Sequence, residues 1–99
     1  MKILVFTATY NESKNIEKLI NKIFSLKINL NLLIVDDNSP DKTYEKILLL
    51  KKKYRRINLI IRKKKEGIDT AHKLAFNFAK KNKYDYLITM DADLSHNPQ

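Results

Sequence analysis

Two aspartates near residue 90 are separated by a single alanine: Asp91 and Asp93 come after the apolar run 86–89 and Met90. Carboxylate oxygens are ligands that Mg²⁺ and Mn²⁺ prefer, and a pair of them leaves coordination positions open for a substrate diphosphate. A lone Asp-x-Asp is common, and its simpler interpretation is two solvated acids in a turn. The strand-like run before it favours a metal site. His96 could add a ligand, although a surface histidine is the simpler interpretation.

A second acidic stretch, DDNSPD at 36–41, follows another apolar run. A calcium loop would need a glycine at its sixth position and a glutamate at its twelfth, and both are missing, so an EF-hand is excluded. Two interpretations remain. The stretch is a turn that leads into a helix, or it carries a carboxylate that accepts hydrogen bonds from a nucleobase or a ribose hydroxyl.

A third polar group, TYNE at 9–12, contains Tyr10 and Glu12. Tyr10 could stack on a base or could cover the edge of a sheet. Glu12 could accept a hydrogen bond from a ligand or could complement the positive end of a following helix. Neither alternative is settled by these residues alone.

The net charge of +9 is concentrated in two basic runs, KKKYRR at 51–56 and RKKK at 62–65. Such runs attract polyanions, including nucleic acid, anionic lipid headgroups and phosphorylated substrates. The simpler interpretation is a solvated, lysine-rich surface, and it is favoured for the first run. The second run is equally open to a functional interpretation because of its place among the predicted elements.

Composition limits the class of protein. With 99 residues, the chain is one domain at most, and an apolar fraction of 43% is ordinary for a folded protein. The absence of cysteine excludes disulfides and thiolate metal sites. No apolar run approaches the roughly 20 residues that span a bilayer, and the start lacks a signal-peptide core. We expect a cytoplasmic protein, soluble or peripheral at the cytoplasmic face of a membrane.

Apolar spacing predicts four strands that alternate with three helices. The strands are expected at 2–7, 32–35, 57–61 and 84–89, and the helices at about 16–24, 44–53 and 71–79. Candidate helix caps are Asn11 or Ser13, then Asp41 or Thr43, then Asp69 or Thr70. The order β-α-β-α-β-α-β predicts an α/β fold with a parallel sheet.

In such a sheet the carboxyl ends of the strands share one edge, where ligands bind. Each strand is followed by one of the polar groups described above: 9–12, 36–41, 63–67 and 91–93. Scattered surface residues would not sort in this way. The sequence therefore predicts a site for a phosphorylated, metal-bound ligand at this edge.

The motifs TYNE, VDDNSPDKT, EGIDTAH and MDADLSHNP, in this order and spacing, resemble family 2 glycosyltransferases, and most of all dolichol-phosphate (polyprenol-phosphate) mannosyltransferases. The resemblance covers the whole chain. It implies a Rossmann-like GT-A fold, with 1–99 as the amino-terminal, donor-binding portion of a single family 2 domain. It also implies transfer of a sugar, expected to be mannose, from a nucleotide-sugar such as GDP-mannose to a polyprenyl (dolichyl) phosphate at a membrane surface.

The resemblance also implies roles by position. The nucleotide-sugar would be contacted by Ala8, Tyr10, Glu12, Val35, Asp37 and Ala92, and Mg²⁺ or Mn²⁺ would be held by Asp91, Asp93 and Ser95. The reaction would be metal-assisted and inverting. No catalytic residue is assigned, because family members need roughly a hundred further residues for the acceptor side. The chain is therefore expected to be a truncated half, which a partner chain could complete.

Four positions depart from the family pattern. Asn38 and Lys42 stand where relatives often carry glycine, and lysine is the less suitable of the two if the backbone there is left-handed. Asp69 replaces a small residue, and the charge of Glu66 would be unfavourable near a phosphate.

Other functions fit less well. Haloacid dehalogenase phosphatases and response-regulator receivers carry their acid pairs after the first strand, and nucleotidyltransferases carry a glycine-rich loop there, which TYNESKN is not. A fragment that binds nucleotide-sugar without turnover, and a basic module that binds anionic membrane or nucleic acid, remain as alternatives. Nucleic acid is the less favoured partner.

Overall fold

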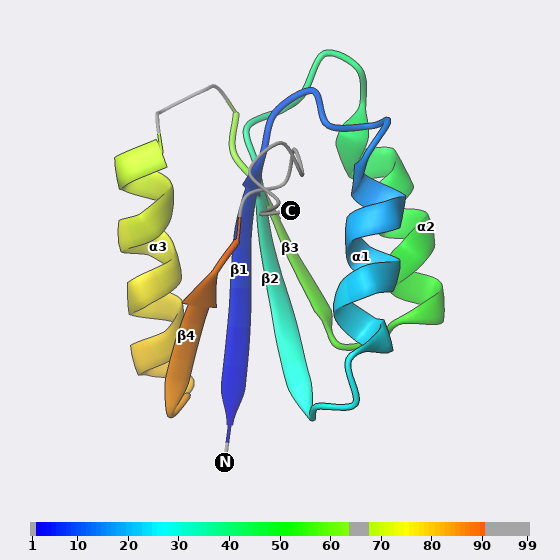
Figure 1. Ribbon diagram of the computed structural model, residues 1–99. Coiled ribbons are helices and arrows are strands. Elements are labelled where there is room, and N and C mark those ends of the chain that lie inside the picture. Colours follow the sequence, from blue (N-terminus) through cyan, green and yellow to red (C-terminus); the bar gives the residue numbers. More distant parts are fainter. Residues whose placement is uncertain (1, 64–67, 91–99) are drawn as a thin grey trace, which may run out of the picture.

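The computed structural model describes residues 2–63 and 68–90. Its elements alternate as predicted (Figure 1). They are β1 (Ile3–Thr9), α1 (Ile16–Ser25), β2 (Leu30–Asp36), α2 (Thr43–Lys53), β3 (Ile57–Ile61), α3 (Ile68–Lys81) and β4 (Tyr86–Thr89). Among these residues, no helix is long and apolar enough to cross a membrane.

The four strands form one parallel sheet in the order β3-β2-β1-β4. The chain therefore moves outward from β1 to β3 and then returns to the other side of β1. This reversal is a topological switch point, and in open parallel sheets ligands bind in the crevice outside the carboxyl ends of the strands at such a point. The predicted parallel α/β fold is confirmed, and its switch point lies between β1 and β4.

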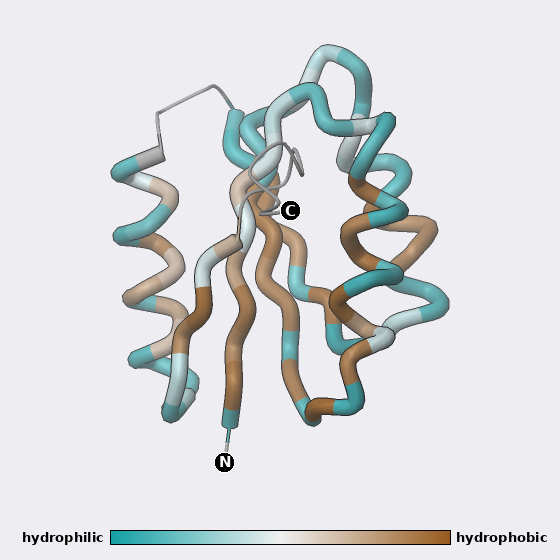
Figure 2. Tube along the Cα trace, in the orientation of Figure 1, coloured by the Kyte–Doolittle hydropathy of each residue, from teal (hydrophilic) through white to brown (hydrophobic). Residues whose placement is uncertain are grey.

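Two apolar cores hold the layers together. Helices α1 and α2 cover one face of the sheet and α3 covers the other (Figure 1). Figure 2 shows the strands at the centre as the most continuously apolar part of the chain. The α1–α2 side is filled by large aliphatic residues such as Leu19, Ile20 and Ile34, and each contributes about 1.5–3 kcal/mol by its burial. The α3 side uses small residues, with Ala71 and Ala75 against Phe6.

The middle of the sheet is buried on both faces, as the run 32–35 predicts. Leu32, Leu33, Ile34 and Val35 are all fully buried. The edge strand β4 is different, since Tyr86 and Ile88 are about half exposed (54% and 48%). Its outer edge and apolar side chains are open to contact in the part of the chain that the structure describes.

Several of the expected helix caps are wrong. Helix α1 begins after Asn15, whose side chain makes no capping hydrogen bond, so neither Asn11 nor Ser13 is the cap. Asp69 and Thr70 lie within α3 and do not precede it. Lys42 occupies the cap position of α2 and its side chain makes no capping hydrogen bond, so neither Asp41 nor Thr43 is the cap. Asp41 lies one residue earlier, and its Oδ1 accepts the N–H of Thr43 at 3.1 Å.

Candidate functional site

The loops after β1 and β2 are joined at the carboxyl edge of the sheet. The N–H of Asn11 donates to Oγ of Ser39 at 3.0 Å, and Oδ1 of Asn11 accepts the N–H of Asp41 at 3.2 Å. The N–H of Glu12 donates to Oγ1 of Thr43 at 3.0 Å. These bonds bring the polar groups 9–12 and 36–41 together, as the sequence predicts.

Asp41 contributes to the same junction. Its Oδ2 accepts the N–H of Ser13 at 3.1 Å, and its Oδ1 accepts the hydroxyl of Thr43. Desolvation alone would raise the pKa of Asp41, but the hydrogen bonds from Thr43 and Ser13 outweigh it and lower the pKa below its ordinary value. The carboxylate therefore stays ionised and bonded to both loops, so its role is structural.

Asp36 is fully buried and its carboxylate is satisfied within the protein. Oδ1 accepts the hydroxyls of Thr9 and Ser39, both at 2.6 Å, and Oδ2 accepts the N–H of Ser39 at 2.9 Å. This is the turn-forming interpretation of the acidic stretch, and it applies to the first acid of the pair. Asp36 fixes the end of β1 to the start of the loop after β2.

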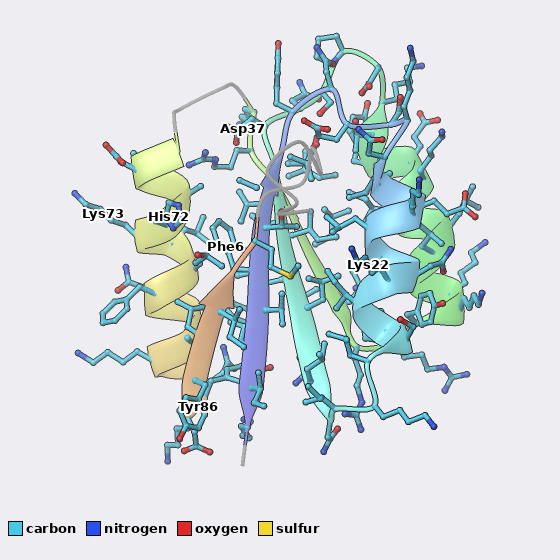
Figure 3. All side chains as sticks on the ribbon, viewed as in Figure 1. Phe6, Lys22, Asp37, His72, Lys73 and Tyr86 are labelled. Carbon is cyan, nitrogen blue, oxygen red and sulfur yellow. The ribbon has the colours of Figure 1, made fainter. Side chains whose placement is uncertain are left out.

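Asp37, the second acid, is paired with Arg62. The guanidinium Nη2 donates to Oδ2 of Asp37 at 2.9 Å, and Nε donates to Oδ1. Nη1 of Arg62 donates to Oγ1 of Thr70 in α3 at 2.7 Å. The side chains of Arg62 and Asp37 are 8% and 11% exposed, so the pair is largely desolvated. Figure 3 shows Asp37 at the carboxyl edge, beyond the ends of the strands.

Arg62 is a site residue that sequence reasoning placed only within a basic run. The strand register could have identified it. Asp36 and Ile61 are partners in the parallel pair of β2 and β3, so the next residue on each strand, Asp37 and Arg62, must also be neighbours. A bidentate arginine holds a carboxylate in one orientation, which gives Asp37 a fixed position at the site edge.

Because side chains alternate along a strand, each residue near the strand ends faces either α3 or the α1–α2 layer. Ala8 and Val35 are partners across β1 and β2, and both belong to the core that faces α3. The following pair, Thr9 and Asp36, lies on the other face, because successive side chains alternate. Asp37 returns to the α3 side, where Arg62 connects it to that helix.

Tyr10 and Glu12 follow the end of β1 directly. The Tyr10 side chain is 37% exposed, and Glu12 is half-buried beside the loop that follows β2. The structure therefore brings Ala8, Tyr10, Val35 and Asp37 to the carboxyl ends of two adjacent strands, with Glu12 in the neighbouring loop.

The turn that carries this site has a left-handed backbone at two positions where glycine is common in the family pattern. Asn38 has φ of 53° and Lys42 has φ of 59°. Asparagine adopts this conformation readily, and its Nδ2 donates to the carbonyl oxygen of Lys63 at 3.3 Å. Lysine has no such compensation, so Lys42 is the strained residue of the turn.

The expected metal ligands Asp91, Asp93 and Ser95 lie outside the described residues. The same is true of Ala92, expected at the nucleotide-sugar, of His96, and of the loop residues Lys64, Lys65 and Glu66. The residue before Asp91 is fixed. The N–H of Met90 donates to the carbonyl oxygen of Phe6 at 2.9 Å, and Oγ1 of Thr7 donates to the carbonyl oxygen of Met90 at 2.8 Å. The chain therefore leaves β4 beside β1, at the switch point.

Within 2–63 and 68–90, no three acidic or histidine side chains gather as metal ligands. Asp36 and Asp37 are held by Thr9, Ser39 and Arg62, as described above. These two carboxylates therefore do not form a metal site.

The sequence of this chain is similar to one protein family and to several characterised proteins. The family model for glycosyl transferase family 2 matches residues 4–99. A dolichol-phosphate mannosyltransferase of Pyrococcus furiosus is 40% identical over 101 residues, which cover all of this chain and 28% of that protein. A polyprenol monophosphomannose synthase of Mycolicibacterium smegmatis is 31% identical, over 99% of this chain and 37% of that protein. The chain thus spans well under half the length of these relatives.

Solved structures show the same fold. A mannosyltransferase from Pyrobaculum calidifontis, in complex with GDP-Man and Mn²⁺, superposes with a TM-score of 0.79 at 21% identity, over 92% of this chain and 27% of that one. TarS from S. aureus, in complex with UDP, gives 0.77 at 23% identity, over 94% and 28%. These similarities confirm the predicted GT-A type of α/β fold. With the family model covering almost its entire length, the chain belongs to glycosyl transferase family 2.

Proposed function

We propose that this chain forms the donor-binding part of a glycosyltransferase that transfers mannose from GDP-mannose to a polyprenyl (dolichyl) phosphate. One observation carries the proposal. Of the residues expected to contact the nucleotide-sugar, Ala8, Tyr10, Val35 and Asp37 lie together at the carboxyl ends of β1 and β2, next to the switch point at which Met90 is fixed, and Glu12 lies in the neighbouring loop. The named functions of the Pyrococcus and Mycolicibacterium relatives supply the sugar and the class of acceptor.

The nucleoside would lie across the α3 side of this edge. Asp37 would accept hydrogen bonds from the N–H groups of the base, since Arg62 holds its carboxylate in a fixed orientation. The Tyr10 ring would offer an apolar face for stacking, and Glu12 would accept from a hydroxyl. Ala8 and Val35 would line the floor, where small or aliphatic side chains leave room for a ring.

The diphosphate would be bound with a divalent cation, Mg²⁺ or Mn²⁺, held by Asp91 and Asp93, with Ser95 as a further ligand. Two carboxylates and a hydroxyl suit these hard cations. When bound, the cation supplies electrostatic stabilisation of the charge that develops on the departing nucleoside diphosphate. Support for a divalent metal comes from the Pyrobaculum mannosyltransferase, which was solved with GDP-Man and Mn²⁺.

The proposed reaction is an inverting displacement. An oxygen of the acceptor phosphate forms a bond to the anomeric carbon as the bond from that carbon to the GDP oxygen breaks. Because the acceptor is already an anion, no strong general base is needed at this step. The role of this chain's own residues is to hold the nucleotide in place, which lowers the entropic part of the barrier. Because a polyprenyl chain is apolar and partitions into lipid, we propose that the protein acts at a membrane surface, on its cytoplasmic face.

A second candidate function is nucleotide-sugar binding without transfer. The residues assigned above all serve the donor, and this chain covers 28% of the Pyrococcus protein. Transfer requires an acceptor site, and none of the residues assigned above serves one. A partner chain could provide it.

The test is a calorimetric titration of the purified chain with GDP-mannose, GDP and UDP-glucose, in Mn²⁺ and after chelation. We expect guanine nucleotides to bind in Mn²⁺, and binding to disappear on chelation and in Asp91→Ala/Asp93→Ala. A matched control is Glu17→Ala/Glu45→Ala, which removes two exposed acids on α1 and α2 and should leave binding unchanged.

Transfer is measured separately, as radiolabelled mannose that becomes extractable with a polyprenyl phosphate. Binding with transfer supports the first function, and binding without transfer supports the second. No nucleotide binding by a chain whose circular dichroism shows it to be folded would exclude both.

A further inference from the structure

The outer surface of α2 is apolar where a surface helix is normally polar. Ile47 is fully buried against the sheet, yet Leu48 and Leu49, the next two residues, are 47% and 65% exposed. A helix that packs on one side only has a single apolar stripe. Here a second apolar position lies on the side facing away from the core.

Basic residues surround these two leucines. Lys51, Lys52 and Lys53 form the last turn of α2, and Arg55 and Arg56 follow it, all of them exposed. Lys52 lies four residues after Leu48 and three after Leu49, and helical neighbours at these spacings share a face. We call Leu48, Leu49 and residues 51–56 the α2 outer surface.

Acidic residues do little to neutralise this surface. Glu45 is the one acid in α2, and it lies 4.0 Å from Lys42 at the opposite end of the helix. The cations of the last turn are therefore not balanced by an acid within the helix. Figure 1 shows α2 on the outer flank of the molecule, on the side of the sheet opposite α3.

We propose that the α2 outer surface docks on an anionic lipid bilayer. Leu48 and Leu49 would enter the boundary between headgroups and acyl chains, as the apolar face of an interfacial helix does. The lysine stems would lie along the apolar layer while their ammonium groups reach the lipid phosphates. The charge complementarity is direct, since each Lys or Arg adds roughly fivefold to the affinity for an anionic surface.

Two other partners could cover this surface, a second copy of the chain or a nucleic acid, and both fit it less well than lipid. A symmetric contact between two copies through this surface would bring like-charged lysine clusters together, which opposes association. A nucleic acid would match the lysines but would give two exposed leucines no apolar contact. Lipid is the partner that uses both features.

The α2 outer surface is separate from the proposed nucleotide site. The expected nucleotide contacts lie at the carboxyl edge on the α3 side, whereas the basic end of α2 precedes β3 and lies at the amino edge of the sheet (Figure 1). Nucleotide titration and membrane binding can therefore fail separately.

The test is flotation of the chain with vesicles of phosphatidylcholine, with and without 30% phosphatidylglycerol. We expect binding that requires phosphatidylglycerol and weakens with salt. Lys51→Gln/Lys52→Gln/Lys53→Gln should weaken it about 100-fold at low salt, and Leu48→Gln/Leu49→Gln by roughly tenfold or more. The matched control is Phe76→Gln, which removes a 61% exposed apolar side chain on α3 and should bind as the unaltered chain does.

Circular dichroism establishes that each variant is folded, and light scattering gives its oligomeric state. Three results would overturn the proposal: no binding of the unaltered chain to anionic vesicles, equal binding by the leucine variant, or a dimer that the leucine variant converts to a monomer. The last result would instead assign the surface to a contact between copies.

Discussion

At the scale of single residues, Arg62 fixes the position of the Asp37 carboxylate and compensates for its burial. The guanidinium of Arg62 makes three hydrogen bonds inside the protein, two to the carboxylate of Asp37 and one to the hydroxyl of Thr70. A paired, hydrogen-bonded charge tolerates burial, but a charge left alone in the same place does not. Asp37 can therefore serve as a fixed acceptor only while Arg62 is present.

We expect Arg62→Ala to destabilise the fold by about 3–5 kcal/mol, because it leaves a largely buried carboxylate without its partner. Urea unfolding monitored by circular dichroism measures the change. Arg55→Ala, at an exposed arginine, is the control and should shift stability by less than about 0.5 kcal/mol. Equal effects of the two substitutions would contradict the structural role of the ion pair.

Lys42 gives a prediction of the opposite sign. A non-glycine residue in the left-handed region destabilises the folded state by about 1–2 kcal/mol. Glycine relieves this strain, but part of the gain is offset because glycine also increases the conformational entropy of the unfolded chain. Lys42→Gly should therefore stabilise the protein by about 0.5–1 kcal/mol. Lys52→Gly, within α2, should destabilise it by about 1 kcal/mol. The melting temperatures of the two variants, each compared with that of the unaltered chain, test this prediction. A lower melting temperature for both variants would exclude strain at Lys42.

The sequence could reveal one of these two features, the left-handed turn, but not the other, the ion pair. The left-handed turn was foreseeable, because Asn38 and Lys42 occupy positions that favour glycine in the family pattern, and both φ values are positive. The Asp37–Arg62 pair was not foreseeable from spacing along the chain. It depends on the register between β2 and β3, which pairs residues 25 positions apart in sequence.

At the scale of elements, the strands were the most predictable part. The bounds of β3, Ile57–Ile61, match the expectation because a turn follows α2 and a charged run follows the strand. β1 and β2 each extend further than the apolar run, to Thr9 and Asp36. Thr9 and Asp36, the last residues of the two strands, are polar and buried, and their side chains bond to each other across the strands at 2.6 Å. Apolar patterning cannot detect a strand end of that kind.

The edge strand β4 carries the prediction that belongs to this scale. Its exposed edge and the half-exposed side chains of Tyr86 and Ile88 favour pairing between copies. We expect the isolated chain to self-associate as its concentration rises, and Ile88→Lys to reduce this, since an edge lysine opposes strand pairing. Light scattering over a concentration series measures it.

Phe76→Lys is the control for that experiment, since Phe76 is exposed on α3 and belongs to no sheet edge. It should leave association through β4 unchanged. A monodisperse monomer at high concentration for the unaltered chain would contradict the prediction.

At the scale of the whole molecule, the layered α/β architecture followed from the sequence because its signals are redundant. Each helix has a strand on either side, and the polar groups recur after every strand. The distribution of the two cores was less evident. The α3 side is built from alanines, so α3 can approach the sheet closely, whereas the α1–α2 side needs large aliphatic residues to fill the wider space. Both helix layers are thus adapted to the same sheet by side-chain volume.

The strand order also has a consequence for how the molecule is made. Of the four described strands, β1 leaves the ribosome before the others, β2 can pair with one of its edges early, and β3 can then pair with β2. The other edge of β1 pairs with Tyr86–Thr89, so it stays open while nearly all of the described chain is being translated. Contacts between segments so distant in sequence are slow to form. The junction between β1 and β2 can therefore assemble during synthesis, whereas the switch point between β1 and β4 is the last of the described strand pairings to form.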